Sequence, residues 1–440
     1  MQTILINPPV YDFALHDFWL KPFGLLRIAK FLKLNKIDFY FFDFLYKYHP
    51  QLNKIWKPKV DKYGRGKFFY KIVEKPEILK FVKRNFKRYG IPLEIFEEEL
   101  KNKDLKIAFI STGMTYWYLG VKEIINFLRK NFRNIKIFAG GIYANLCPKH
   151  AQKMGIDKII KNFEELAEVL KDFGFKIKYF PEKIEEKILP EFDLYDKKDY
   201  IAVRLIKGCP FRCKYCASWI IDRKIVYSDI QEIAKLIEKS FYKEGIKNFA
   251  FYDDALLLNY GENLKKLKKI LKKDILENIK FHTPNALHLK FINQEVAYLL
   301  KEMNFETIYL GVEYLNLKKW KKLGLKYAEG DFEKALKNLE KAGFKKSQIT
   351  AYILMGLPGQ HPKEVEDTIK IVHEYGIKIM LSEYSPIPQT PLGDFTIKKF
   401  KLNDLLLTNC SVFPIINWGE ETVNELKNLK NQLNLKLREH

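Results

Sequence analysis

Three cysteines near the middle of the chain have the residue type and the spacing of metal ligands. Cys209, Cys213 and Cys216 lie in the stretch KGCPFRCKYCAS. Three thiolates this close together can each ligate a different iron of one cubane iron–sulfur cluster. The alternative is structural zinc, which normally takes four protein ligands in a closed tetrahedron. None of the eight histidines lies near this stretch, and Cys147 and Cys410 are remote in sequence, so the triplet predicts an open metal site with three protein ligands.

The composition limits the kind of protein that surrounds this triplet. Of the 440 residues, 47% are hydrophobic and 15% are aromatic, which is enough apolar material for large cores and excludes a disordered chain. The formal net charge of +23 could attract nucleic acid, but the lysines are spread along the whole chain, as on solvated helix faces. No apolar run reaches the roughly 18 residues of a membrane span. We therefore expect a cytoplasmic protein without a membrane segment.

Two α/β segments are predicted to position the triplet. Over residues 1–175, short apolar runs alternate with amphipathic ones, which predicts a Rossmann-like, doubly wound parallel sheet covered by helices. A basic and aromatic stretch at about 46–103 interrupts this pattern. We predict a folded insertion there, because a structureless loop of that length is unusual. The polar segment 176–199 is expected to be a linker.

A second alternation of apolar and amphipathic runs covers residues 200–395. Six apolar runs predict six β/α units, and hence a partial, TIM-like (β/α)6 barrel, followed by a C-terminal extension at 396–440. Ser228 and Gln231, in capping-box spacing, are expected to begin the first helix of this barrel. In such barrels ligands gather at the carboxyl ends of the strands, and the cysteine triplet directly follows the first apolar run.

The triplet, with the aromatic Tyr215 before its last cysteine, resembles the signature of the radical S-adenosylmethionine (SAM) superfamily. In that family, SAM binds the fourth iron of a 4Fe–4S cluster, and the reduced cluster cleaves SAM to give a 5′-deoxyadenosyl radical. The resemblance implies the same two cofactors here, a SAM contact by Tyr215, and an external reductant such as flavodoxin or ferredoxin. It leaves the catalytic residues undefined, as well as the substrate, which we expect to be a small molecule or a peptide.

Further SAM contacts are implied at the ends of two barrel strands. Asp253 and Asp254 follow the second strand, where the family contacts the SAM amino group, although the usual Gly-Gly-Glu is missing. Glu313 follows the fourth strand, where it is expected to hydrogen-bond the ribose hydroxyls. For the aspartates, helix capping is the local alternative.

The fifth and sixth strands imply the adenine side of the same site. Gly356 and Gly359, after the fifth strand, would let the backbone approach adenine closely. Tyr384, after the sixth strand, would complete the adenosine wall. The local alternative is that Gly-Leu-Pro-Gly simply makes a turn.

The first segment resembles the cobalamin-binding domain that precedes many radical SAM barrels. The matching stretches include INPPV, STGMTYWYLGVKEII and FAGGIYANLCPKHAQKMGIDKII. The resemblance implies cobalamin contacts after the third and fourth strands, at Ser111, Thr112, Tyr116, Gly140 and Gly141. No histidine lies in the Asp-x-His-x-x-Gly pattern that supplies a lower axial ligand, so any bound cobalamin would lack a histidine ligand. A domain that has kept this shape and lost its ligand is the alternative.

Together, the two resemblances imply a radical SAM enzyme, with cobalamin-dependent methyl transfer to an unactivated carbon as the leading function. A cobalamin-independent radical SAM enzyme that carries out rearrangement, oxidation or cyclisation is the second hypothesis. An RNA-modifying enzyme is a third. The sequence shows no separate RNA-binding module, so nucleic acid is not the expected partner.

Overall fold

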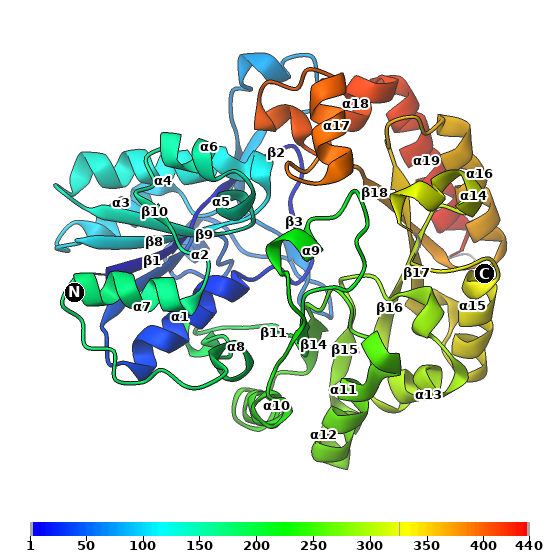
Figure 1. Ribbon diagram of the computed structural model, residues 1–440, viewed down its shortest axis with the longest axis horizontal. Helices are drawn as coiled ribbons and strands as arrows, with labels where there is room; N and C mark the ends of the chain where they lie inside the picture. Colours follow the sequence, from blue (N-terminus) through cyan, green and yellow to red (C-terminus); the bar gives the residue numbers. More distant parts are fainter. Residues whose placement is uncertain (1–2, 325, 438–440) are drawn as a thin grey trace. The chain divides into compact units, whose positions relative to one another are not determined.

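The computed structural model describes residues 3–324 and 326–437. The chain divides into two compact units, Met1–Lys198 and Asp199–His440. Each unit contains a parallel β-sheet with helices packed around it (Figure 1), which confirms the predicted α/β class with a Rossmann-like first part. Within the described ranges, no helix is long and apolar enough to cross a membrane.

The first unit is built on a five-stranded parallel sheet with the order β10-β9-β8-β1-β4. Its strands are β1 (Thr3–Asn7), β4 (Phe39–Asp43), β8 (Ile107–Thr112), β9 (Lys136–Gly141) and β10 (Lys158–Ile159). Read from β4 and numbered along the chain, the order is 2-1-3-4-5, which is the flavodoxin-like form of a doubly wound sheet. In such sheets ligands bind outside the carboxyl ends of the strands, where the order reverses, which here is between β1 and β8.

The helices of the first unit are α1 (Phe23–Leu34), α2 (Leu52–Ile55), α3 (Leu93–Leu100), α4 (Tyr118–Asn131), α5 (Ile142–Leu146), α6 (Pro148–Lys153), α7 (Phe163–Asp172) and α8 (Ile184–Lys187). Of these, α1, α4, α5 and α7 pack against strands of this sheet. In β1, Ile4, Leu5 and Ile6 are fully buried, as expected for a parallel strand that is covered on both faces. Phe138 of β9 stacks on Phe109 of β8 within the same core.

The stretch 46–103 contains the helices α2 and α3 and three short strands that pair in antiparallel fashion. β6 (Tyr70–Ile72) pairs with β7 (Lys87–Tyr89), and β7 pairs with β2 (Val10–Asp12) near the start of the chain. β5 (Gly66–Lys67) pairs with β3 (His16–Asp17). Because β2 and β3 belong to the segment that follows β1, these pairings hold the stretch 46–103 against that segment. β7 lies between β2 and β6, so two partner strands fix its register.

The segment 176–199, which we expected to be a linker, packs against the first unit. Arg27 of α1 donates to the Ile188 carbonyl at 2.6 Å and pairs with Glu185 at 3.0 Å. The Tyr195 hydroxyl donates to Asp43 at 2.6 Å. A buried guanidinium needs such partners, and the sequence pattern alone did not reveal that Arg27 would recruit them from this segment.

The second unit contains a six-stranded parallel sheet with the order β11-β14-β15-β16-β17-β18. These strands are β11 (Ile201–Val203), β14 (Asn248–Phe251), β15 (Lys280–His282), β16 (Phe305–Glu313), β17 (Ile349–Met355) and β18 (Lys378–Glu383). β11 and β18 form the two edges of the sheet, so the barrel is open. Phe251 and Phe305 stack at 13° with ring centroids 5.6 Å apart, so aromatic side chains from β14 and β16 contribute to its core.

Helices follow each strand of the second unit. They are α9 (Ser218–Ile221), α10 (Ile230–Glu244), α11 (Leu258–Ile270), α12 (Lys273–Asn278), α13 (Gln294–Glu302), α14 (Leu317–Trp320), α15 (Asp331–Lys341), α16 (Pro362–Glu374), α17 (Pro391–Lys399), α18 (Phe413–Trp418) and α19 (Glu420–Lys436). The predicted cap of α10 is wrong by one residue. Asp229 accepts from the backbone N–H groups of Gln231 and Glu232, whereas Ser228 donates to the Arg204 carbonyl at 2.7 Å.

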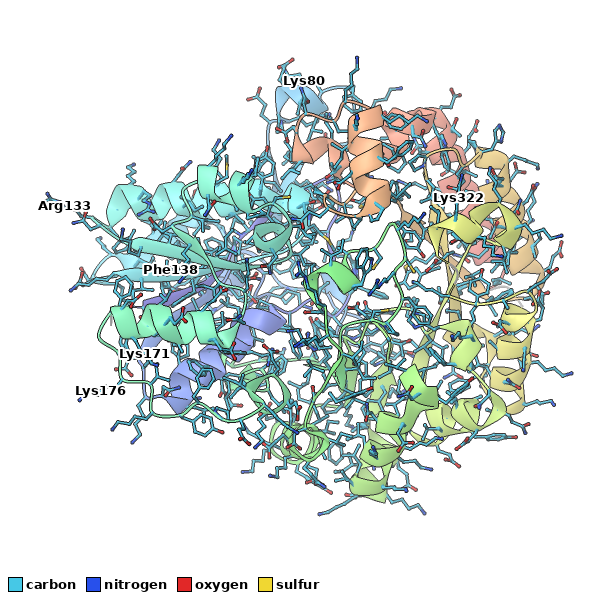
Figure 2. All side chains as sticks on the ribbon, viewed as in Figure 1. Lys80, Arg133, Phe138, Lys171, Lys176 and Lys322 are labelled. Carbon is cyan, nitrogen blue, oxygen red and sulfur yellow. The ribbon has the colours of Figure 1, made fainter. Side chains whose placement is uncertain are left out.

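The basic side chains are distributed over both units. Figure 2 labels Lys80, Arg133, Lys171, Lys176 and Lys322, which extend outward from the ribbon, and all five are exposed. These five basic side chains lie at solvated positions in both units.

Candidate functional site

The cysteine triplet lies on a loop that is closed at its base by a short antiparallel ladder. β12 (Ile206–Lys207) pairs with β13 (Val226–Tyr227), and the triplet lies between them. Gly208 starts the loop with φ +89°, and a Cβ there would lie 2.7 Å from the Lys224 carbonyl oxygen, so the turn requires glycine. Local geometry therefore fixes where the loop begins.

Two other segments of the second unit hold this loop by backbone hydrogen bonds. The Lys214 N–H donates to the Leu323 carbonyl at 2.9 Å, and the Leu392 N–H donates to the Lys214 carbonyl at 2.9 Å. The Cys216 N–H donates to the Cys213 carbonyl at 3.1 Å. These backbone bonds do not depend on the cysteine side chains.

The chemistry of the three cysteines fits an iron–sulfur cluster. Burial raises the pKa of Cys209 to about 11 and that of Cys213 to about 12, so a bound metal has to supply the positive charge that keeps these sulfurs as thiolates. In the part of the chain that the structure describes, no three His, Cys, Asp or Glu side chains converge on a point where a single metal ion would fit.

Glu313 occupies a strained position at the end of β16. Its φ is +59°, and the strand is bulged there, because Gly311 pairs with Tyr352 and Glu313 pairs with Ile353. Left-handed conformations of residues other than glycine are uncommon and cluster at functional sites. The Tyr327 hydroxyl contacts the carbonyl oxygens on both sides of Glu313, those of Val312 and Tyr314, and so braces the turn.

The Glu313 carboxylate connects the end of β16 with the cysteine loop. One oxygen accepts a hydrogen bond from the Tyr215 hydroxyl, and the other accepts from Lys326 Nζ at 2.7 Å. Burial lowers the pKa of Lys326, but Glu313 and the neighbouring thiols Cys213 and Cys216 raise it by more, so the ammonium stays charged. The side chain of Lys326 is about 20% exposed and that of Glu313 about 10%.

Lys326 was missed in the sequence, although Tyr215 and Glu313 were both predicted. No motif contains it, because it lies 13 residues beyond Glu313 on a connecting segment. Its association with the loop is a tertiary contact, and lysines are too frequent in this chain for one of them to stand out.

The two aspartates after β14 have different surroundings. Asp253 is 2% exposed and accepts backbone N–H hydrogen bonds from Leu205 at 3.0 Å and Ile206 at 2.6 Å. Burial raises its pKa to about 7, against the effect of those hydrogen bonds. Burial raises the pKa of Asp254 as well, while the neighbouring Ser218 hydroxyl, next to the triplet, acts to lower it. Asp253 thus holds the end of β11, and Asp254 is the better placed of the two for a ligand beside the cysteines.

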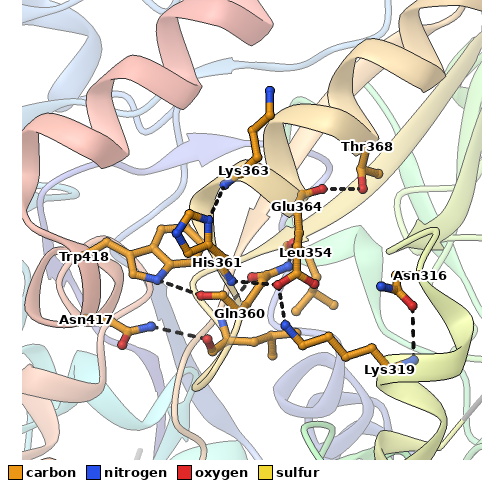
Figure 3. Close-up of polar contacts among 11 residues, drawn as sticks. Asn316, Lys319, Leu354, Gln360, His361, Lys363, Glu364, Thr368, Asn417 and Trp418 are labelled. Carbon is orange, nitrogen blue, oxygen red and sulfur yellow. Dashed lines mark hydrogen bonds and ion pairs between the residues drawn. The ribbon is translucent and has the colours of Figure 1, made fainter.

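The turn after β17 is clamped by residues from the C-terminal part of the chain (Figure 3). Asn417 Nδ2 donates to the Gly356 and Leu357 carbonyls, both at 3.3 Å, and Trp418 Nε1 donates to the Gln360 carbonyl at 3.2 Å. Figure 3 shows both side chains reaching this turn from the α18 segment. The turn therefore depends on contacts with residues about 60 positions later in the chain.

Packing within the second unit surrounds two of the three residues predicted on the adenine side. Gly356 has φ +90°, and a Cβ there would lie 2.9 Å from Pro414 Cγ. Tyr384 is 3% exposed, and its hydroxyl lies 3.3 Å from Thr396 Oγ1. Gly359, with φ +77°, faces open space. Contact with adenine stays a prediction for all three residues, and the packing around Gly356 and Tyr384 counts against those two.

In the first unit, polar side chains connect the ends of three neighbouring strands. Asn7 of β1 donates from Nδ2 to Asp43 of β4 at 2.6 Å and accepts from the Ser111 hydroxyl of β8 at 3.1 Å. These residues lie where the strand order reverses, which is the usual ligand edge of such sheets. Asn7 and Asp43 were not predicted from the sequence, although each is a polar residue at the end of an apolar run.

The other residues predicted to contact cobalamin have structural roles of their own. Thr112 donates to the Gly140 carbonyl at 2.9 Å and accepts from the Ala144 N–H at 3.1 Å. A Cβ on Gly140 would lie 2.9 Å from the Ile160 carbonyl oxygen, and one on Gly141 would lie 2.2 Å from that of Thr112. Close packing of the chain's own backbone therefore accounts for both glycines, without a ligand.

Exposed apolar side chains occur beside these strand ends. Met114, shortly after β8, is 41% exposed, and Ile142, directly after β9, is 36% exposed. Tyr116 is 5% exposed and packs on Trp117. The apolar surface near this edge is thus provided by Met114 and Ile142.

Comparisons with known proteins agree with the resemblance. Residues 203–372 match the family model described as the radical SAM superfamily. An uncharacterized methyltransferase of Pyrococcus horikoshii is 25% identical over 250 residues, which are 55% of this chain and 50% of that protein. The threonylcarbamoyladenosine tRNA methylthiotransferase MtaB of Thermotoga maritima is 24% identical over 289 residues, which are 62% of this chain and 64% of that protein. The chain spans between half and two-thirds of the length of these two relatives.

Two solved structures share the fold over nearly the whole chain. The radical SAM methyltransferase TsrM of Kitasatospora setae, with tryptophan substrate and a SAM analogue bound, has a TM-score of 0.65 at 13% identity, and the match covers 91% of this chain and 76% of TsrM. The cobalamin-dependent SAM radical enzyme OxsB has a TM-score of 0.57 at 12% identity, with 98% of this chain and 61% of OxsB covered. At such identities the likeness establishes the fold alone.

Proposed function

We propose, from the match of residues 203–372 to the radical SAM superfamily model, that the protein is an enzyme that cleaves SAM reductively, with a 4Fe–4S cluster on Cys209, Cys213 and Cys216. The cluster would supply one electron to the SAM sulfonium, whose S–C5′ bond then breaks to give methionine and a 5′-deoxyadenosyl radical. The observation that carries the proposal is the position of the triplet, directly beyond β11 and β12 and linked through Tyr215 to the end of β16.

The residues around the triplet would bind and orient SAM. Glu313 would accept hydrogen bonds from the ribose hydroxyls. To do so, its carboxylate would give up the hydrogen bond that it now accepts from Tyr215 or from Lys326. Lys326 places a positive charge among three thiolates, which offsets part of the negative charge that collects there. Asp254 is an acceptor for the SAM amino group beside the loop.

For the reaction class, we propose cobalamin-dependent methyl transfer to an unactivated carbon. Support comes from the flavodoxin-like sheet of the first unit, from the fold shared with TsrM and OxsB, and from the relative described as a methyltransferase. Cobalamin would supply the methyl group, and Met114, Ile142 and Ser111 lie near the sheet edge where such a ligand would bind.

The decisive experiment separates SAM cleavage from cobalamin dependence. The protein is reconstituted anaerobically with iron and sulfide, reduced with dithionite, and incubated with SAM in the presence or absence of hydroxocobalamin. Mass spectrometry then measures 5′-deoxyadenosine and S-adenosylhomocysteine. Formation of 5′-deoxyadenosine, with S-adenosylhomocysteine only when cobalamin is present, supports both parts of the proposal. If 5′-deoxyadenosine forms and cobalamin changes nothing, the enzyme is a cobalamin-independent radical SAM enzyme, and if neither product forms, the cleavage proposal fails.

A further inference from the structure

A pocket of about 420 Å³ borders the cysteine loop within the second unit. Its lining includes Cys209, Arg212, Trp219, Asp222 and Arg223. Trp219 Nε1 donates to the Cys213 carbonyl at 3.2 Å. Cys209 therefore forms part of the pocket wall, and Trp219, another lining residue, is hydrogen-bonded to the backbone of Cys213.

The rim of this pocket carries unpaired positive charge. Arg212 and Arg223 are exposed, and neither makes a hydrogen bond or an ion pair with any residue that the structure describes. Asp222, the acidic residue of the lining, already pairs with Lys207 at 3.4 Å. Unpaired guanidiniums at a surface are suited to bidentate contacts with carboxylates supplied from outside.

Two more exposed lysines extend this positive surface. Lys214 lies between two of the cysteines, and Lys224 follows Arg223. Residues 207–227 contain five basic residues and one acidic residue, a net charge of +4. We refer to Arg212, Lys214, Arg223 and Lys224 as the loop-side basic surface.

We propose that the loop-side basic surface docks an acidic electron-transfer protein of the flavodoxin or ferredoxin class, which reduces the cluster. The inference rests on the proposed function, since SAM cleavage consumes one electron that must come from outside the protein. In each encounter the carrier loses one electron and the cluster gains it, and no bond is made or broken between the two proteins.

Two observations favour such a carrier as the occupant of this surface. The charges lie on the cysteine loop itself, so a docked partner would come close to Cys209. The arginines stand exposed at the rim, where a large partner can reach both. Opposite charges on two surfaces speed diffusional encounter and set orientation, and small, transient interfaces are characteristic of electron-transfer partners.

The test compares the full-length R212E/R223E variant with the unchanged protein after cluster reconstitution. The probe is an acidic flavodoxin, and its dissociation constant is measured by biolayer interferometry at low and at high salt. We expect at least a tenfold loss of affinity for the variant at low salt, and little difference between the two proteins at high salt, because salt screens exposed charges. The matched control is K334E/K337E, two exposed lysines of α15, which should bind flavodoxin like the unchanged protein.

A second readout uses the source of electrons. With reduced flavodoxin, R212E/R223E should form 5′-deoxyadenosine at least five times more slowly, whereas with dithionite its rate should match that of the unchanged protein. The docking proposal is overturned if R212E/R223E binds flavodoxin as tightly as the unchanged protein does. It is overturned in the same way if this variant keeps its affinity for flavodoxin and loses binding to a structured RNA. If the unchanged protein forms no 5′-deoxyadenosine with dithionite, the proposed function fails, and the affinity measurement still decides the docking surface.

Discussion

Lys326 donates a hydrogen bond from Nζ to Glu313 Oε1 at 2.7 Å, beside the loop that carries the three cysteines. The other oxygen of the same carboxylate accepts from Tyr215, which lies within the triplet. A strained strand end, a buried cation and the cysteine loop are therefore joined through one carboxylate. Breaking a mostly buried pair on one side leaves the other charge without its partner, and this makes the pair testable.

Replacing Lys326 with Met should destabilise the protein by about 2 kcal/mol, because the Glu313 carboxylate then remains largely buried without a cation. The measurement is urea-induced unfolding followed by circular dichroism. The control is the double variant E313Q/K326M, in which neither charge remains. We expect it to be less destabilised than the sum of the two single variants, and strict additivity would show that the pair contributes no coupling.

Replacing Glu313 with Ala should weaken SAM binding about tenfold, because one charged hydrogen bond to a ligand contributes about 1.5 kcal/mol. Isothermal titration of SAM into the reconstituted protein measures the change. Glu306, at the other end of β16, provides the matched control, since its partner is Lys280. An E306A variant should bind SAM normally, and unchanged affinity in E313A would remove Glu313 from the site.

Replacing Cys209, Cys213 and Cys216 together with Ala should abolish iron and sulfide binding and leave the fold largely intact. The reason is that backbone hydrogen bonds hold the loop without the sulfurs: the Lys214 N–H donates to the Leu323 carbonyl, and the Leu392 N–H donates to the Lys214 carbonyl. Visible absorbance with iron and sulfide analysis reports the cluster, and circular dichroism reports the fold. A C147A/C410A variant should retain the full cluster, and full cluster absorbance in the triple variant would contradict the assignment.

Replacing Gly141 with Ala should destabilise the first unit by about 2 kcal/mol or more, since φ is +111° and the new Cβ would lie 2.2 Å from the Thr112 carbonyl oxygen. Gly174, with φ +82° and no atom within 4 Å of its Cβ position, is the matched control. A G174A variant keeps the backbone penalty without the clash and should cost about 1 kcal/mol. Equal shifts of the urea midpoint in the two variants would contradict this prediction, since they would show that the contact between the new Cβ and the Thr112 carbonyl oxygen does not destabilise the fold.

The stability of the protein should fall in acid partly because of His288. Burial, with smaller effects of Lys326 and Lys290, lowers the pKa of this imidazole to about 3, and its ring stacks on Phe211 at 4.7 Å. The unfolded chain takes up a proton near pH 6.5 and the folded one does not. The contribution of His288 is therefore complete above pH 6.5 and is lost as the pH falls from 6.5 toward 3, by about 2 kcal/mol at pH 5. Thermal unfolding between pH 4.5 and 7.5 should show a weaker pH dependence for H288F, and an unchanged dependence would assign the acid sensitivity to other groups.

Local features of the chain were predictable because they depend on neighbouring residues. The spacing of the cysteines and the alternation of short apolar runs with amphipathic ones both depend on residues only a few positions apart. They predicted the two parallel sheets and placed the triplet after the first barrel strand. The cap of α10 was off by one residue because Ser228 and Asp229 both favour capping, and the choice depended on the hydrogen bond from Ser228 to Arg204.

The sequence by itself therefore determined the α/β class, the order of the strands' apolar runs and the place of the three cysteines in the chain, for which cluster binding stays a prediction. Only the tertiary structure decided which side chains meet around them. Lys326 reaches Glu313, Asn417 clamps the turn at Gly356, and Arg27 binds the segment near Ile188. These contacts join residues far apart in the chain, and their free energy comes from satisfying buried charges and carbonyls, a requirement that exists only once the chain has folded.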